Sequence, residues 1–148
     1  MAVDLSFMTL DVFADRAFGG NPLAVYPNAE HLDSAQMQRI ALEMNYSETT
    51  FILPPKDPAH TAQVRIFTPI AELPFAGHPS VGTAWALGLK PSWIPGAKGR
   101  EHMTFEQMAG VVDVELEYSV SGEVAACWIT APQPYQQRHT IPQEVLAD

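Results

Sequence analysis

The sequence predicts a mixed α/β domain, and three observations carry this prediction. Short apolar segments alternate with turn-forming residues along most of the chain, which is typical of strands. Two other segments space their apolar residues as helices do. The length of 148 residues, with 47% apolar and 17% charged side chains, suits one globular domain with a substantial core.

The N-terminal half is expected to hold four strands and one helix. Apolar residues recur at helical spacing from Met37 to Met44, with Asp33 or Ser34 as the N-cap and Asn45 as the C-terminal stop. β-branched and apolar runs between turns predict the strands. These strands are expected at residues 3–13, 23–26, 49–53 and 63–68.

The C-terminal half is expected to open with a second helix and to continue as an antiparallel meander. Pro79 fits the first helical position, where no amide donor is needed, and the helical pattern continues to Gly88. Three strands follow at 103–107, 111–118 and 124–129, with a hairpin turn at 121–122. Residues 131–148 have the composition of an inter-domain linker followed by the start of a truncated helix, so the predicted domain is 1–130.

Composition argues against several classes of partner. The net charge of −9 disfavours nucleic acid, because phosphate contacts need clustered Lys and Arg. The single cysteine, Cys127, excludes an internal disulfide and a thiol-based zinc site. The first 13 residues resemble neither a signal peptide nor a membrane span, so a cytoplasmic protein without a membrane partner is expected. Residues 54–99 carry a net charge of +2, so this part of the chain repels an anionic ligand least.

Two polar clusters lie beside predicted strands. In residues 20–25, the amide of Asn21 could bind a ligand, although an ordinary turn before a strand explains the same pattern. In residues 43–51, Glu48 lies between a helix end and an apolar strand. A carboxylate in apolar surroundings has a raised pKa, which suits proton transfer near neutral pH. Ser47 or Asn45 could steer it by hydrogen bonding; the alternative is a loop glutamate that faces water.

A third cluster, residues 65–82, joins a strand to the second helix. The helix begins near Gly77 and His78, where free backbone amides and the helix dipole favour a carboxylate or a phosphate. Gly77 allows close approach of a ligand, and His78 could titrate near neutrality or simply be a capping or core histidine. The sequence has no phosphate-binding loop, HExxH or GxSxG motif, so metal binding and serine hydrolysis are poorly supported.

Taken in order, the three clusters resemble the phenazine-biosynthesis PhzF-like isomerase family, which shares the diaminopimelate epimerase-like fold. The resemblance implies one domain of a two-domain fold, in which each domain is an α+β mixed sheet wrapped around a central helix. The active site of such proteins lies in the cleft between the domains. The stretches that carry the resemblance are Asp11–Phe13 with Gly20–Val25, Glu43–Phe51, and Arg65–Pro69 with Glu72–Pro79.

The resemblance implies a cofactor-independent isomerase of a small carboxylic acid. Glu48 matches the residue that removes a proton from carbon and returns it elsewhere on the substrate. Gly77 and His78 match the loop that holds the substrate, and Asn21 and Ser47 match positions near the cleft. The related epimerases have a catalytic cysteine where this chain has an alanine at position 76, so one carboxylate that shuttles one proton is the chemistry implied.

Members of this family are about twice as long as this chain. A second domain or a partner copy, as in a homodimer, is therefore expected to complete the cleft. No cofactor and no metal are expected. The rival hypothesis is a non-catalytic or vestigial module that binds small carboxylates without turnover.

Overall fold

One mixed sheet contains all the strands of the computed structural model, which describes residues 4–96 and 98–134. The order within the sheet is β1-β2-β3-β4-β6-β7-β8, and β5 pairs with β4. The β2–β3 and β4–β6 pairs are parallel, and the other pairs are antiparallel. The strands are β1 Met8–Val12, β2 Asn21–Tyr26, β3 Glu48–Leu53, β4 Ala62–Phe67, β5 Glu72–Leu73, β6 His102–Gln107, β7 Gly110–Tyr118 and β8 Val124–Thr130.

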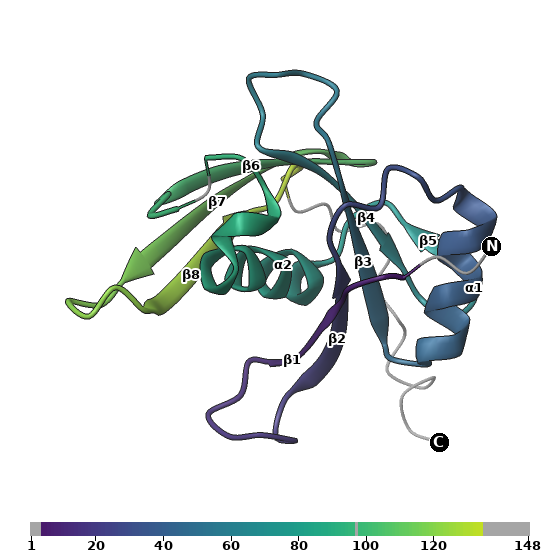
Figure 1. Cartoon of the computed structure of the whole chain (residues 1–148), viewed down its shortest axis with the longest axis horizontal. Coiled ribbons are helices and arrows are strands. Elements are labelled where there is room, and N and C mark those ends of the chain that lie inside the picture. The colour runs from purple at the N-terminus through teal and green to yellow at the C-terminus, as the bar shows by residue number, and fades with distance from the viewer. Residues whose placement is uncertain (1–3, 97, 135–148) are drawn as a thin grey trace, which may run out of the picture.

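The sheet curls around helix α2, Gly77–Leu89, which lies between β1–β3 on one side and β6–β8 on the other (Figure 1). Alternate residues of the strands point at this helix, and together they form the larger hydrophobic core. This arrangement confirms the mixed sheet around a central helix. Residues on several sides of the helix are buried, and most of them are small or apolar: Pro79, Ser80, Gly82, Thr83, Ala84, Ala86 and Leu87.

Helix α1, Ser34–Met44, covers the opposite face of the sheet, over β3 and β4 (Figure 1). Its residues Met37 and Ala41 pack in a second, smaller core. A capping box begins the helix: the Asp33 carboxylate accepts the Gln36 N–H, and the Gln36 side chain accepts the Asp33 N–H. Asn45 ends the helix in the left-handed conformation with φ of 52°. Both predicted ends of this helix are confirmed.

The largest differences from the sequence prediction concern three features. Helix α2 begins at Gly77, as expected from residues 77–78, but Pro79 is its third residue rather than its first, because Ala76 is extended and its carbonyl accepts the Ser80 N–H. Strand β1 begins at Met8 rather than at residue 3, and Met8 pairs with Val25, next to the last residue of β2. The two-residue strand β5 went unpredicted because prolines flank it on both sides.

The predicted helix start at 142–147 lies outside the described residues, and so does most of the predicted linker. Among the described residues, no helix is long and apolar enough to cross a membrane.

Two glycines let the sheet approach α2 closely. A Cβ at Gly82 would lie 2.5 Å from the Leu23 side chain and 2.7 Å from that of Val12. A Cβ at Gly88 would lie 2.5 Å from the side chain of Val124 in β8, at the other end of the sheet. Strands from both ends of the sheet therefore touch the helix backbone, which holds the curled sheet tightly around it.

We expect Gly82→Ala to lower the free energy of unfolding by about 1 kcal/mol. Overpacking costs about 1–3 kcal/mol, and the better helix propensity of alanine offsets up to about 1 kcal/mol. Denaturant unfolding measures the difference. Gly77→Ala is the matched control in the same helix, because its Cβ would meet nothing within 4 Å. A more stable Gly82→Ala protein would contradict the close approach.

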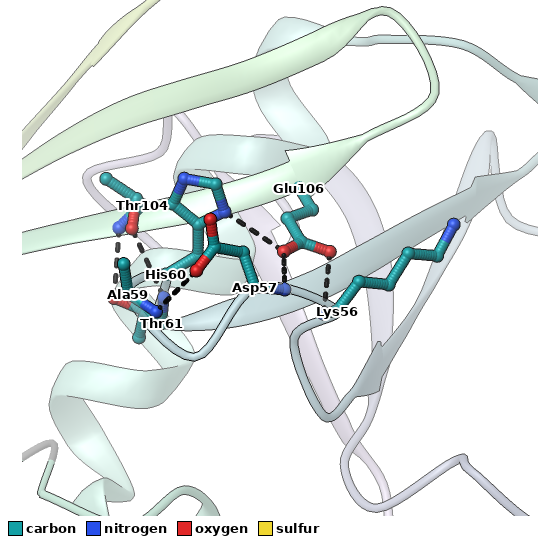
Figure 2. Close-up of polar contacts among 7 residues, drawn as sticks. All are labelled: Lys56, Asp57, Ala59, His60, Thr61, Thr104 and Glu106. Carbon is teal, nitrogen blue, oxygen red and sulfur yellow. Dashed lines mark hydrogen bonds and ion pairs between the residues drawn. The ribbon is translucent and has the colours of Figure 1, made fainter.

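Glu106 on β6 ties down the loop between β3 and β4 (Figure 2). Its carboxylate accepts the backbone N–H groups of Lys56 at 2.9 Å and Asp57 at 2.8 Å, and it contacts His60 Nδ1 at 3.0 Å. The backbone N–H of Asp57, followed by the side chain of His60 and the backbone N–H of Lys56, lowers the pKa of Glu106 to about 2. One carboxylate thus fixes this loop against the neighbouring strand.

We expect Glu106→Gln to lower the free energy of unfolding by roughly 1–2 kcal/mol at neutral pH. Hydrogen bonds to a charged group contribute about 1.5–3 kcal/mol, and the glutamine amide keeps one of the two acceptor oxygens. The pKa of Glu106 falls from 4.5 to about 2 on folding, so the difference should be full above pH 4.5 and fade as pH falls toward 2. Urea unfolding across this range measures it. Glu117→Gln, an exposed change on β7, is the control; an equal loss there would refute the role of Glu106.

Candidate active site

The parallel pairing of β2 and β3 brings two predicted site residues to the same end of the sheet. Asn21 is the first residue of β2, and Glu48 is the first residue of β3. Side chains alternate along a strand, so Glu48 shares a face with Thr50 and Ile52. Ile52 belongs to the core around α2. Glu48 therefore points toward α2 and away from α1.

A buried hydrogen bond joins β3 to α2. The hydroxyls of Thr50 and Thr83 lie 2.9 Å apart, and both residues are fully buried. This contact holds the strand that begins with Glu48 against the helix that begins with Gly77. Sequence reasoning missed both threonines. The available signal was a polar residue, Thr50, on the same strand face as Glu48.

The start of α2 carries His78 to Glu48. His78 Nε2 and Glu48 Oε2 are 3.1 Å apart, with 12% and 16% of the two side chains exposed. Within the described residues, neither atom makes a geometrically acceptable hydrogen bond, although both are buried. Buried polar atoms are almost always bonded in folded proteins, so an unbonded pair at a surface-accessible helix start is typical of a ligand site.

Asn21 and Ser47 complete the polar cluster. The Ser47 hydroxyl lies 2.6 Å from Asn21 Oδ1, and Asn21 Nδ2 lies 3.2 Å from His78 Nδ1. The same hydroxyl lies 3.2 Å from the Pro22 carbonyl. Of the two residues predicted to steer Glu48, Ser47 is linked to it through Asn21 and His78, whereas Asn45 serves as the C-cap of α1.

The first turn of α2 offers free backbone donors beside Glu48. Ala76, the N-cap, has no side chain that could accept from the amides of Gly77 and His78. Pro79 has no N–H, and the Ser80 N–H is directed to the Ala76 carbonyl. The space around Gly77 is open, because a Cβ there would meet nothing within 4 Å. Two amides at the positive end of a helix, with open space at Gly77, suit a carboxylate.

Burial decides the charge of His78. Desolvation lowers its pKa below the usual 6.5, and the nearby Glu48 charge and the Pro22 carbonyl oppose that shift. The imidazole is therefore neutral at pH 7. The Glu48 carboxylate therefore faces an uncharged ring at this contact rather than a cation.

A metal site and a cysteine nucleophile are poorly supported by the described residues. The described residues contain no group of three or more His, Cys, Asp or Glu that could hold a metal ion. Cys127 lines a pocket of about 280 Å³ with Phe13 and Trp85, and burial raises its pKa to about 11, so it is a poor nucleophile. It is partly buried against the core.

A hollow of about 850 Å³ lies elsewhere, between β4, β6 and the β3–β4 loop, and none of the predicted site residues line it. Its charged side chains are largely paired with one another. Arg65 donates two hydrogen bonds of 2.7 Å to Glu72, and His60 contacts Glu106. Glu72 and Glu106 in this hollow are therefore hydrogen-bonded, unlike Glu48 Oε2 at the start of α2.

The fold and the site together define a diaminopimelate epimerase-like domain with a carboxylate at the start of its central helix. The family model for phenazine biosynthesis-like proteins, PhzC-PhzF, matches residues 10–147, and the chain belongs to this family. The chain is 40% identical over 141 residues to a trans-2,3-dihydro-3-hydroxyanthranilate isomerase of Pseudomonas aeruginosa. That match covers 95% of this chain and 48% of the relative, so the chain spans about half its length.

Solved structures agree with this assignment. A PhzF-family phenazine biosynthesis protein of Bacillus anthracis matches with a TM-score of 0.69 and 28% identity, over 82% of this chain and 39% of that one. A hydroxyproline epimerase of Agrobacterium vitis matches with a TM-score of 0.61 and 19% identity, over 84% of this chain and 41% of that one. The second likeness shows the shared fold alone.

We expect His78 to titrate below pH 6.5, and Glu48→Gln to lower its pKa further. The Glu48 charge is the contribution that favours the imidazolium, so its removal leaves desolvation less opposed. NMR titration of the His78 ring measures both values. His102, an exposed residue at the start of β6, gives an internal reference signal in each sample. A His78 pKa that rises in Glu48→Gln would show that the two groups do not interact as their distance indicates.

Proposed function

We propose that this chain forms half of a cofactor-independent isomerase that acts on a small carboxylic acid. The observation that supports it best is the juxtaposition of Glu48, neutral His78 and the free amides at the start of α2. A carboxylate that is not neutralised by a cation can act as a base. Donors beside it can stabilise the negative charge that forms when a substrate loses a proton from carbon.

In the proposed reaction, the substrate carboxylate binds the backbone N–H groups of Gly77 and His78. Glu48 takes a proton from a carbon conjugated with that carboxylate; the C–H bond breaks and an O–H bond forms on Glu48. The electron pair spreads over the conjugated system toward the carboxylate, where the α2 amides and the helix dipole stabilise it. Glu48 then returns the proton to a different carbon, which regenerates the base and gives the isomer.

The second wall of the site is proposed to come from a further domain or from a second copy of the chain in a homodimer. The chain spans 48% of the Pseudomonas aeruginosa relative, and Gly77 is exposed. A covered site would exclude water from the proton on Glu48, which favours its return to the substrate. The name of that relative makes trans-2,3-dihydro-3-hydroxyanthranilate the first substrate to try.

The alternative is a module that binds small carboxylates without turnover. The exposed amide of Gly77 favours this reading, because it binds an anion equally well whether or not Glu48 acts. The two functions differ in one respect: only the isomerase moves hydrogen between substrate and protein.

We expect the protein to introduce deuterium from D2O into a carbon-bound position of trans-2,3-dihydro-3-hydroxyanthranilate, and Glu48→Gln to slow this at least about 100-fold, as for the loss of a general base. Mass spectrometry and NMR of the recovered acid follow the exchange. Glu43→Gln, an exposed change on α1, is the matched control. Undiminished exchange in Glu48→Gln would remove Glu48 from the mechanism. Carboxylate binding without exchange in the unmodified protein would support the binding module.

A further inference from the structure

We propose that Asn21 is a positioning residue that sets the tautomer of His78 and keeps the ring proton on Nε2, the nitrogen that faces Glu48. The inference rests on the proposed function, in which Glu48 carries the proton. Four side chains support it, and they form one continuous polar chain: Ser47, Asn21, His78 and Glu48.

The first step is the orientation of the Asn21 amide. The atom that faces the Ser47 hydroxyl lies 2.6 Å away. This distance is common for an O–H···O bond and shorter than N–H···O bonds usually are, so the Asn21 oxygen faces Ser47. The hydroxyl donates to that oxygen, and the amide nitrogen must then face the other way, toward His78.

The second step is the state of the ring. Asn21 Nδ2 lies 3.2 Å from His78 Nδ1, and an amide NH2 can only donate. His78 Nδ1 must therefore accept with its lone pair. Because burial lowers the pKa of His78, the neutral ring has a single proton, and that proton lies on Nε2.

The third step is the consequence for Glu48. Nε2 lies 3.1 Å from Glu48 Oε2. An N–H at this distance attracts the carboxylate, whereas a lone pair would repel it. A protonated Nε2 also cannot accept the proton that Glu48 takes from the substrate. Asn21 thus prevents His78 from competing as a base, so the proton on Glu48 is returned to carbon.

The test is NMR of the ring nitrogens in protein labelled with ¹⁵N-histidine, at about pH 9, where neutral imidazole dominates. The nitrogen that carries hydrogen and the one with a lone pair give well-separated signals, and His78→Gln identifies those of His78. We expect the Nε2–H form in the unmodified protein. We expect Asn21→Asp, which can only accept, to invert the ring to the Nδ1–H form. Asn28→Asp makes the same change at another exposed position and should leave the tautomer unchanged.

Ser47→Ala is a second, milder variant at the surface. It removes the hydroxyl that orients the Asn21 amide, so we expect a mixture of the two tautomers without loss of the fold. An Nδ1–H form in the unmodified protein, or an Nε2–H form that persists in Asn21→Asp, would overturn the inference. The readout needs no substrate. A wrong tautomer with intact deuterium exchange removes this inference alone, and lost exchange with the expected tautomer removes the proposed function alone.

Discussion

The enclosure of α2 by a single curled sheet is the constraint on which the rest of the structure depends. A helix buried on several sides leaves few of its backbone groups open to solvent, and these lie at its ends. The small residues of α2 let strands from both ends of the sheet reach its backbone, with Gly82 against Leu23 and Gly88 against Val124. Once the helix is fixed in this way, its first turn has one position relative to the strand starts of β2 and β3.

That position determines the electrostatics of the site. The start of α2 presents two amides and the positive end of the helix dipole, which attract an anion. Glu48 lies beside this turn, with its Oε2 at 3.1 Å from His78 Nε2. Burial keeps His78 neutral, and the site holds no lysine or arginine among its contacts with Glu48. In the described part of the site, Glu48 is thus not neutralised by a neighbouring cation, which is the condition that the proposed proton transfer needs.

Local patterns in the sequence predicted the parts of the fold that depend on local chemistry. Asp33 and Asn45 define the ends of α1 because capping uses residues a few positions apart. The Thr50–Thr83 and Asn21–His78 contacts join residues 33 and 57 positions apart, so no local pattern could predict them. Pro79 is the third residue of α2 rather than the first, because a proline is accepted throughout the first turn, where its missing N–H breaks no helical hydrogen bond.

Glu48 could be found from the sequence only as one candidate among several loop carboxylates. Its motif resembled that of a known family, and this resemblance singled it out. The structure adds what the motif lacks: alternation along β3 turns Glu48 toward α2, and the parallel register pairs it with Leu23, two residues after Asn21. The family match over residues 10–147 agrees with the resemblance, while the roles of Glu48, Asn21, Ser47, Gly77 and His78 are proposals.

The central claim is that the start of α2 binds a carboxylate beside Glu48. The most direct measurement is an NMR titration of the backbone amides with anthranilate, a small aromatic carboxylate. The account predicts saturable shifts of the Gly77 and His78 amides, with Gly122 in the exposed β7–β8 turn unmoved. Unchanged Gly77 and His78 amides at saturating ligand, or shifts confined to the hollow beside Arg65 and Glu106, would contradict it.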